Sequence, residues 1–235
     1  GHASISCENT ANTNNGAANF QIGGVVGFTQ GRKTDVLTLL ERCVNYSDIT
    51  AEATRLAGVV GTTNGYTRTV DCTNNGKIWC TDTKATNSRP AGIVSAMGDV
   101  TYLTRDVNNG DIAFAVEGNQ TQGYAAGIVG QTNDSTGSSV IDGCASYGTV
   151  QSDIWLGENK YMGIVCADFN SKTVTVSNCI IGGKIGPYTV NEDNQLVTIT
   201  ADNFDQYYAL EPETRFANVT FEGNQFGEKS DGKYR

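Results

Sequence analysis

The sequence has little histidine, proline or methionine. Its 235 residues include 3 prolines, 2 methionines and 1 histidine, His2, near the start of the chain. Ser-His-Asp and Cys-His catalysis need a histidine beside the nucleophile, and many metal sites need one as a ligand. The composition therefore argues against these classes of enzyme, and we expect neither a metal nor another cofactor.

Positive charge is also scarce. The chain has 16 lysines and arginines against 25 aspartates and glutamates, which gives a net charge of −9. Nucleic acids and anionic membrane surfaces are bound by clustered Lys and Arg, and the longest basic run is Arg32-Lys33. We therefore expect no nucleic-acid partner and attribute the acidity to solubility.

Long apolar runs are missing as well. No segment approaches the roughly 18 apolar residues of a membrane-spanning helix, so we expect no membrane insertion in this segment. Gly1-His2-Ala3-Ser4 is not a signal peptide, which neither shows nor excludes export. The chain does have 28 glycines and frequent β-branched residues, which suit many short strands joined by tight turns.

A glycine motif recurs at nearly constant spacing. Its five copies are GGVVG at 23–27, AGVVG at 57–61, AGIVS at 91–95, AGIVG at 126–130 and MGIVC at 162–166. The second residue of each copy is glycine, and these glycines are separated by 34, 34, 35 and 36 residues. A fixed period of this kind indicates a repeat architecture in which each unit stacks on its neighbours.

A second motif, C-x-N-x-x-x-I, alternates with the first and often has glycine at its fifth position. Its recurring residues are Cys7, Cys43, Cys72, Cys144 and Cys179 in the first position and Asn9, Asn45, Asn74 and Asn108 in the third. We expect the cysteines to fill an interior column and the asparagines to hydrogen-bond from one coil to the next. The glycines are expected to supply positive φ at the bends.

The short β-branched runs predict strands and show no persistent helical period. We therefore predict an all-β fold, a right-handed parallel β-helix (β-solenoid) of about five to six turns over residues 1–186. Equivalent residues of successive coils would lie about 4.8 Å apart. Stacked cysteines could form disulfides, but their periodic placement favours a buried, reduced column.

Residues 187–235 differ in composition from the repeats. They contain no cysteine, but 4 of the 8 phenylalanines and 4 of the 10 tyrosines. Because the end of a solenoid exposes unpaired strand edges, we interpret this segment as a non-repeating C-terminal cap. The alternative is that it begins a second module.

The combination of GG-[VI]-VG with C-x-N-x-G-x-[IV] resembles GLUG-type repeats. These occur in surface and secreted bacterial proteins, including large adhesins and proteins labelled as immunoglobulin A1 protease-like. The resemblance covers roughly residues 1–186 and departs from the pattern at Asp106 and Cys166. It implies a β-helix-like fold and an extracellular or cell-surface location in a bacterium, and it transfers no catalytic residue.

Aromatic residues supply the first candidate binding surface. Trp79, Trp155, Tyr124 and Tyr161, together with Tyr147, could form a surface on which sugars stack, because aromatic rings offer flat apolar area with a polar handle. The competing interpretation is that these side chains pack loops onto the solenoid. The sequence leaves both open and favours the second.

Acidic residues supply the second candidate group. Asp99, Asp106 and Asp111 lie in the unit that lacks its cysteine, so this irregular unit marks either a site or simple drift. Two carboxylates about 5–10 Å apart suffice for a glycosidase, and Asp99 and Asp111 are candidate ligand-binding residues. Asp48, Lys77 and Asp111 alternate in charge down one column, which favours an exposed charge ladder over a catalytic group.

These observations predict a non-enzymatic adhesion or binding module, extracellular or on the cell surface, and monomeric. Its partner would be a glycan or a host protein, or the rod would act as a spacer. The first alternative is a polysaccharide-active β-helix enzyme, a lyase or glycoside hydrolase, which rests on analogy of fold. The second is a non-catalytic fragment of a larger secreted protease.

Overall fold

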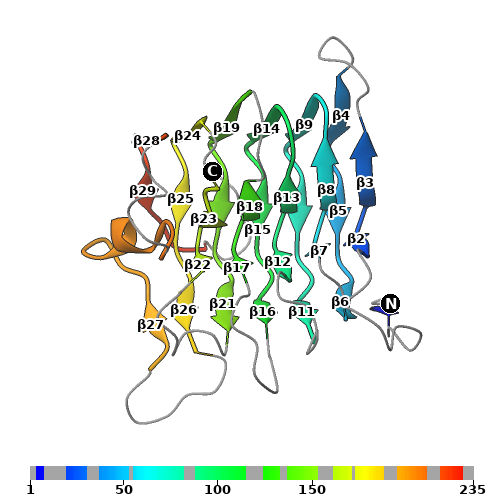
Figure 1. Cartoon of the computed structure of the whole chain (residues 1–235). Helices are drawn as coiled ribbons and strands as arrows, with labels where there is room; N and C mark the ends of the chain where they lie inside the picture. The colour runs from blue at the N-terminus through cyan, green and yellow to red at the C-terminus, as the bar shows by residue number, and fades with distance from the viewer. Residues whose placement is uncertain are drawn as a thin grey trace.

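The chain winds into a stack of coils, each of which passes through five short strands. The computed structural model describes residues 4–7, 20–30, 37–52, 55–81, 88–114, 124–132, 137–152, 161–170, 173–187, 195–210 and 218–229. Equivalent strands of successive coils pair to form five sheets, named A to E. Figure 1 shows the coils side by side, with the N-terminal coil at one end of the row and the C-terminal strands at the other.

The strands fall into the five sheets in a regular order. Sheet A comprises β1 (Ser4–Cys7), β6 (Asp48–Ala51), β11 (Ile78–Cys80), β16 (Ile112–Phe114), β21 (Thr149–Ser152), β26 (Lys184–Gly186) and β27 (Val197–Thr198). Sheet B comprises β2 (Gln21–Gly23), β7 (Arg55–Ala57), β12 (Arg89–Ala91), β17 (Ala125–Ala126) and β22 (Met162–Gly163). Sheet C comprises β3 (Val26–Gln30), β8 (Val60–Asn64), β13 (Val94–Met97), β18 (Val129–Thr132) and β23 (Cys166–Asp168).

Sheets D and E complete each coil. Sheet D comprises β4 (Thr38–Glu41), β9 (Thr67–Val70), β14 (Thr101–Thr104), β19 (Ser138–Asp142), β24 (Thr173–Ser177) and β28 (Val219–Glu222). Sheet E comprises β5 (Val44–Asn45), β10 (Thr73–Asn74), β15 (Val107–Asn108), β20 (Ala145–Ser146), β25 (Ile180–Ile181) and β29 (Gln225–Phe226). Five passes through sheet B, from β2 to β22, make about four complete turns, with partial coils at both ends. The predicted all-β parallel solenoid is confirmed, with about four complete turns where five to six were predicted.

The core is built from columns of like residues. The column that opens sheet A contains Ile49, Ile78, Ile112, Val150 and Ile185, each 0% exposed. Burial of a side chain of this size contributes roughly 1.5–3 kcal/mol. One coil alone has nothing to bury these side chains against, so the stability of the fold comes from stacking between neighbouring coils.

The predicted asparagine hydrogen bonds run through the stack beside this core. Asn45 Nδ2 donates to Asn74 Oδ1 at 2.8 Å, and Asn74 Nδ2 donates to Asn108 Oδ1 at 2.8 Å. Each of the three also donates to the main-chain oxygen two residues further along its own turn. The amide group suits this position because it donates and accepts at once.

The glycine motif marks the sharp corner between sheets B and C. A Cβ on Gly58 would collide with the side chain of Asn74 and with the main-chain oxygen of Gly92 in the next coil. Glycine is therefore required for the close approach of neighbouring coils. The prediction that motif glycines supply positive φ is wrong except at Gly183, where φ is +80°.

Left-handed backbone occurs instead at the bend just before the cysteine column. The residues with positive φ there are Arg42, Asp71, Arg105, Gly143, Asn178 and Gly223. Glycine, asparagine and aspartate adopt this conformation more readily than most residues. The position is therefore set by the coil geometry and tolerates several residue types.

The fifth coil is shifted by one residue relative to the alignment of the glycine motifs. Ala126 pairs with Gly163 and Val129 pairs with Cys166. Ile164 therefore takes the place of the motif glycine in this coil. The prediction that placed Cys166 at a glycine position is corrected, because Cys166 fills a buried valine position.

The first coil also differs from the motif alignment. β1 pairs with β6 of sheet A, which places Cys7 opposite Ala51. Cys7 is therefore not part of the cysteine column, and that prediction is wrong. Strand pairing aligns Ile5 with Ile49, and in this register Cys7 lies outside the cysteine column although its residue type fits the motif. Asn9 lies outside the described residues.

The C-terminal segment, predicted as a non-repeating cap, begins with an irregular connection. After β26 the chain returns antiparallel as β27 and forms a 3₁₀ helix, η2 (Phe204–Tyr207). It then adds β28 and β29 in parallel to sheets D and E. Asn224 stands in the cysteine column, where its Oδ1 accepts from Cys179 N at 2.8 Å. The segment thus closes the stack with a partial coil, and a domain boundary at 186/187 stays a prediction.

Candidate functional site

One column of side chains on sheet B faces away from the core. It contains Gln21, Arg55, Arg89, Tyr124 and Tyr161. Their neighbours along the strands, such as Leu56 and Met162, belong to the core, and successive strand residues point to opposite faces of a sheet. The column therefore lies on the face of sheet B that points away from the core, one residue per coil.

The middle of this column brings an arginine onto two tyrosines. Arg89 Cζ lies 5.4 Å from the ring centroid of Tyr124, a cation–π contact. The rings of Tyr124 and Tyr161 lie 5.0 Å apart, tilted by 47°. All three side chains are nearly buried, with exposed fractions of 9%, 5% and 7% respectively. Packing therefore holds the two rings and the guanidinium in fixed places.

Sheet C contributes a carboxylate and an amide beside this arginine. Gln131 Nε2 donates a hydrogen bond to Asp168 Oδ2, and Asp168 is completely buried. Burial lowers the pKa of Arg89, the charge of Arg55 lowers it further, and Tyr124 and Asp168 oppose both effects. Asp168 therefore lies within electrostatic reach of the Arg89 guanidinium.

The corner glycines let the two sheets meet this closely. A Cβ on Gly130 would lie 3.1 Å from Arg89 Cβ and 3.1 Å from Arg89 O. The Ser95 hydroxyl donates to the same Arg89 oxygen. The residues that meet here are named the corner cluster and are Arg55, Arg89, Tyr124, Tyr161, Gln131 and Asp168.

Several polar atoms of this corner are buried without a hydrogen-bond partner in the structure. They are the Nε atoms of Arg55 and Arg89, Gln131 Oε1, Gln21 Oε1 and Thr62 Oγ1. A buried polar atom without a partner costs about 1–3 kcal/mol. These atoms can hydrogen-bond the hydroxyl groups of a sugar, and the two aromatic rings beside them can stack on its apolar face.

The other predicted binding residues lie elsewhere. Trp79 is on β11 of sheet A, where Lys77 Nζ sits 4.6 Å from its ring centroid. Asp99 accepts a hydrogen bond from Gly65 N at 2.8 Å, in the turn between sheets C and D. Trp155 lies outside the described residues. Tyr124 and Tyr161 are thus the predicted aromatic residues that the structure brings together.

The aspartates of the predicted charge ladder accept hydrogen bonds from main-chain N–H groups. Asp48 Oδ1 accepts from Lys77 N at 2.7 Å, and Asp111 Oδ1 accepts from Thr149 N at 2.8 Å. Each carboxylate thus ties its own coil to the next. Over the described ranges no ion pair joins Asp48, Lys77 and Asp111, since those observed are Arg42–Glu41 and Arg105–Asp71.

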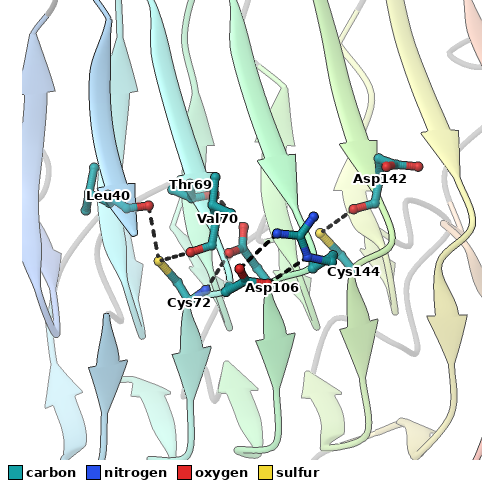
Figure 2. Close-up of polar contacts among 9 residues, drawn as sticks. Leu40, Thr69, Val70, Cys72, Asp106, Asp142 and Cys144 are labelled. Atoms are coloured by element: carbon teal, nitrogen blue, oxygen red, sulfur yellow. Dashed lines mark hydrogen bonds and ion pairs between the residues drawn. The ribbon is translucent and has the colours of Figure 1, made fainter. Parts of the chain in front are cut away.

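Asp106, in the irregular unit, is a structural group. Its Oδ1 accepts from Cys72 N at 2.8 Å and its Oδ2 accepts from the Thr69 hydroxyl (Figure 2). Burial raises the pKa of Asp106 to about 7, against the opposing effect of these hydrogen bonds. Asp106 is completely buried and held by its own chain, and the interpretation of this unit as a binding site stays a prediction for Asp99 and Asp111.

The cysteine column carries thiols that donate to main-chain oxygens. Cys72 Sγ lies 3.5 Å from Leu40 O in the preceding coil and 3.6 Å from Val70 O (Figure 2). The described cysteines that form no disulfide are Cys43, Cys72, Cys80, Cys144, Cys166 and Cys179. Burial raises the pKa of Cys72 and of Cys179 to about 12. Thiols in this state are poor nucleophiles.

The described part of the chain contains neither a candidate metal site nor a membrane-spanning helix. No group of three or more His, Cys, Asp or Glu side chains gathers closely enough there to hold a metal ion. The helices of that part are all too short or too polar to cross a membrane.

Sequence reasoning missed Arg55, Arg89, Gln131 and Asp168. One signal was present for the two arginines: Gln21, Arg55, Arg89 and Tyr124 each lie three residues before a motif glycine. Tyr161 lies two residues before Gly163 and joins the column because the fifth coil is shifted by one residue. Gln131 and Asp168 carry no such signal, because their residue types do not recur in the other coils.

No family model and no curated protein matches the chain. One solved structure does, a crystal structure of a "putative immunoglobulin A1 protease" from Bacteroides ovatus. The two share 14% sequence identity with a TM-score of 0.49, over 96% of this chain and 66% of that one. The chain therefore spans just under two thirds of that protein. The resemblance to GLUG-type repeats is not confirmed and stays a prediction.

Proposed function

We propose that this chain is a non-enzymatic binding module of a secreted or cell-surface bacterial protein, and that its corner cluster binds a glycan. The observation that carries the proposal is the aromatic pair Tyr124 and Tyr161 beside Arg89, whose guanidinium Nε has no acceptor. Sugars are held by this combination of flat apolar rings and hydrogen-bond donors. The remainder of the solenoid acts as a rigid rod that presents the cluster.

A glycan array with the purified chain tests the proposal, followed by titration of the best ligand against variants. Replacement of Tyr161 by alanine is expected to weaken binding by up to about tenfold, since stacking on an aromatic ring is worth about 0.5–1.5 kcal/mol. Tyr46→Ala is the control, because Tyr46 is a tyrosine that follows β5, is 64% exposed and is not part of the corner cluster. Silence of the array, or equal loss in both variants, would refute the proposal.

A second candidate is a polysaccharide-active enzyme. The buried carboxylate of Asp168 beside Arg89 is the observation in its favour. Glycosidases of the common type use two carboxyl groups about 5–10 Å apart, and the corner cluster contains one. Release of reducing ends or of unsaturated products from a panel of polysaccharides, lost in Asp168→Asn, would favour the enzyme over the binding module.

A further inference from the structure

Two arginines of the corner cluster face each other across neighbouring coils. Arg55 on β7 pairs in register with Arg89 on β12. Paired positions of neighbouring strands lie about 4.8 Å apart. Two guanidinium groups that start from adjacent positions on the same face of a sheet repel each other unless a negative charge lies between them.

Within the described ranges, this pair of positive charges is largely uncompensated. The ion pairs of the described residues involve Arg42 and Arg105, at another corner of the coil. Arg89 is 9% exposed, and the Nε atoms of both Arg55 and Arg89 are buried without an acceptor. Buried charges of this kind are normally paired. Carboxylates outnumber basic groups in this chain, whose net charge is −9, yet these two Nε atoms have no acceptor.

Nearby groups oppose the repulsion only in part. Burial lowers the pKa of Arg55, and burial together with the Arg55 charge lowers the pKa of Arg89. Asp168 raises the pKa of Arg89, but its carboxylate also accepts a hydrogen bond from Gln131. The carboxylate that acts on Arg89 is therefore shared with Gln131.

We propose that Arg55 and Arg89 form an oxyanion site that holds the carboxylate or sulfate group of an acidic glycan. The inference rests on the proposed function, because Tyr124 and Tyr161 continue the same column and would contact the sugar ring next to the charged group. Guanidinium groups bind carboxylates and sulfates through their N–H donors, and the Nε atoms of Arg55 and Arg89 each supply one donor that has no acceptor in the structure. An anion between the two arginines also removes the repulsion described above.

The test compares three probes by calorimetry with the intact chain: oligogalacturonate, a neutral oligosaccharide of the same length, and inorganic sulfate. Oligogalacturonate is expected to bind at least about tenfold more tightly than the neutral probe, because a charge-assisted hydrogen bond is worth about 1.5–3 kcal/mol. Its affinity should fall as salt is added. Inorganic sulfate should compete with it for the same site.

The variants are Arg55→Gln and Arg89→Gln, with Arg68→Gln as the matched control because Arg68 is exposed on sheet D. Either corner variant is expected to weaken oligogalacturonate binding by about tenfold, and the control to leave it unchanged. Circular dichroism checks that each variant folds. Arg55 is the safer position, because it is only partly buried.

The outcomes separate the anion site from the proposed function. If neutral and acidic probes bind equally, and Tyr161→Ala weakens both while the arginine variants do not, glycan binding stands and the oxyanion site is refuted. If sulfate alone binds and the arginine variants abolish it, the anion site stands with a free oxyanion as its ligand, and glycan binding is refuted. If no probe binds, both are refuted.

Discussion

Asp106 and Asn224 do the same job in two different coils. Asp106 Oδ1 lies 2.8 Å from the main-chain nitrogen of Cys72, and Asn224 Oδ1 lies 2.8 Å from the main-chain nitrogen of Cys179. Asn224 completes its contacts by donating from Nδ2 to Val176 O at 3.0 Å. The cysteine column therefore accepts an uncharged amide, and the charge of Asp106 is not required.

We expect Asp106→Asn to stabilise the protein at neutral pH. The pKa of Asp106 is raised from 3.8 in the unfolded chain to about 7 in the fold. The folded state therefore favours the protonated carboxyl, a contribution that is full below pH 4 and lost as the pH rises through about 7. The stability advantage of the variant should grow between pH 5 and pH 8, by up to a few kcal/mol.

Urea unfolding at a series of pH values measures this difference. Other carboxyl groups titrate in both proteins, so their contributions cancel when the free energies of unfolding are subtracted. An advantage that stays constant from pH 5 to pH 8 would contradict the assignment of the pKa to Asp106.

The asparagine hydrogen bonds give a second prediction. Asn74→Ala removes one acceptor from Asn45 and one donor from Asn108, both buried. Each group left unpaired costs roughly 1–3 kcal/mol. Asn74→Ala should therefore lower the free energy of unfolding by more than Asn75→Ala does. The control residue is adjacent, and its side chain accepts one partly buried hydrogen bond from Asn109. Equal losses of unfolding free energy in urea for the two variants would show that the buried amide hydrogen bonds contribute no more to stability than the partly buried one.

The glycine positions differ in what they tolerate. Gly58→Ala should destabilise strongly or prevent folding, because its Cβ would meet main-chain and asparagine atoms of neighbouring coils. Gly143→Asn should cost less than about 1 kcal/mol, because asparagine already occupies the equivalent bend at Asn178 with a φ of +54°. Thermal unfolding of the two variants compares them, and a larger loss of Tm in Gly143→Asn would overturn the assignment.

Thiol accessibility gives a fourth prediction. Cys72, Cys144 and Cys179 are buried, and burial raises the pKa of each thiol, so iodoacetamide should leave them unmodified in the folded protein at pH 8. Cys43 is only partly buried and should react first. Peptide mass spectrometry with and without urea reads each site. Rapid labelling of Cys72 in the absence of urea would contradict the buried column.

The repeating features of this molecule could be predicted from sequence, because the same residue types recur in successive coils. Ile78 and Ile112, or Asn74 and Asn108, mark the same place 34 residues apart, and stacking then follows. The shift in the fifth coil could not be predicted. MGIVC matches the motif by residue type, whereas strand pairing places Cys166 opposite Val129.

The corner cluster could be predicted only in part for the same reason. Tyr124 and Tyr161 are aromatic and attract attention as single residues, but their contact depends on the register of sheet B. Arg89 shares its column with one other arginine, Arg55, and Asp168 lies in a column that holds other residue types in the other coils. Only the pairing of strands distant in sequence reveals that they share a corner.

The asparagine chain has a consequence for how such a protein can change length. Each link joins one loop only to the loops directly above and below, through an identical pair of amides. Excision of residues 58–91, one full period, would bring Asn45 face to face with Asn108 and allow the same amide-to-amide hydrogen bond. The molecule would shorten by about 4.8 Å. Its length can therefore change in steps of one coil when whole repeats are lost or gained.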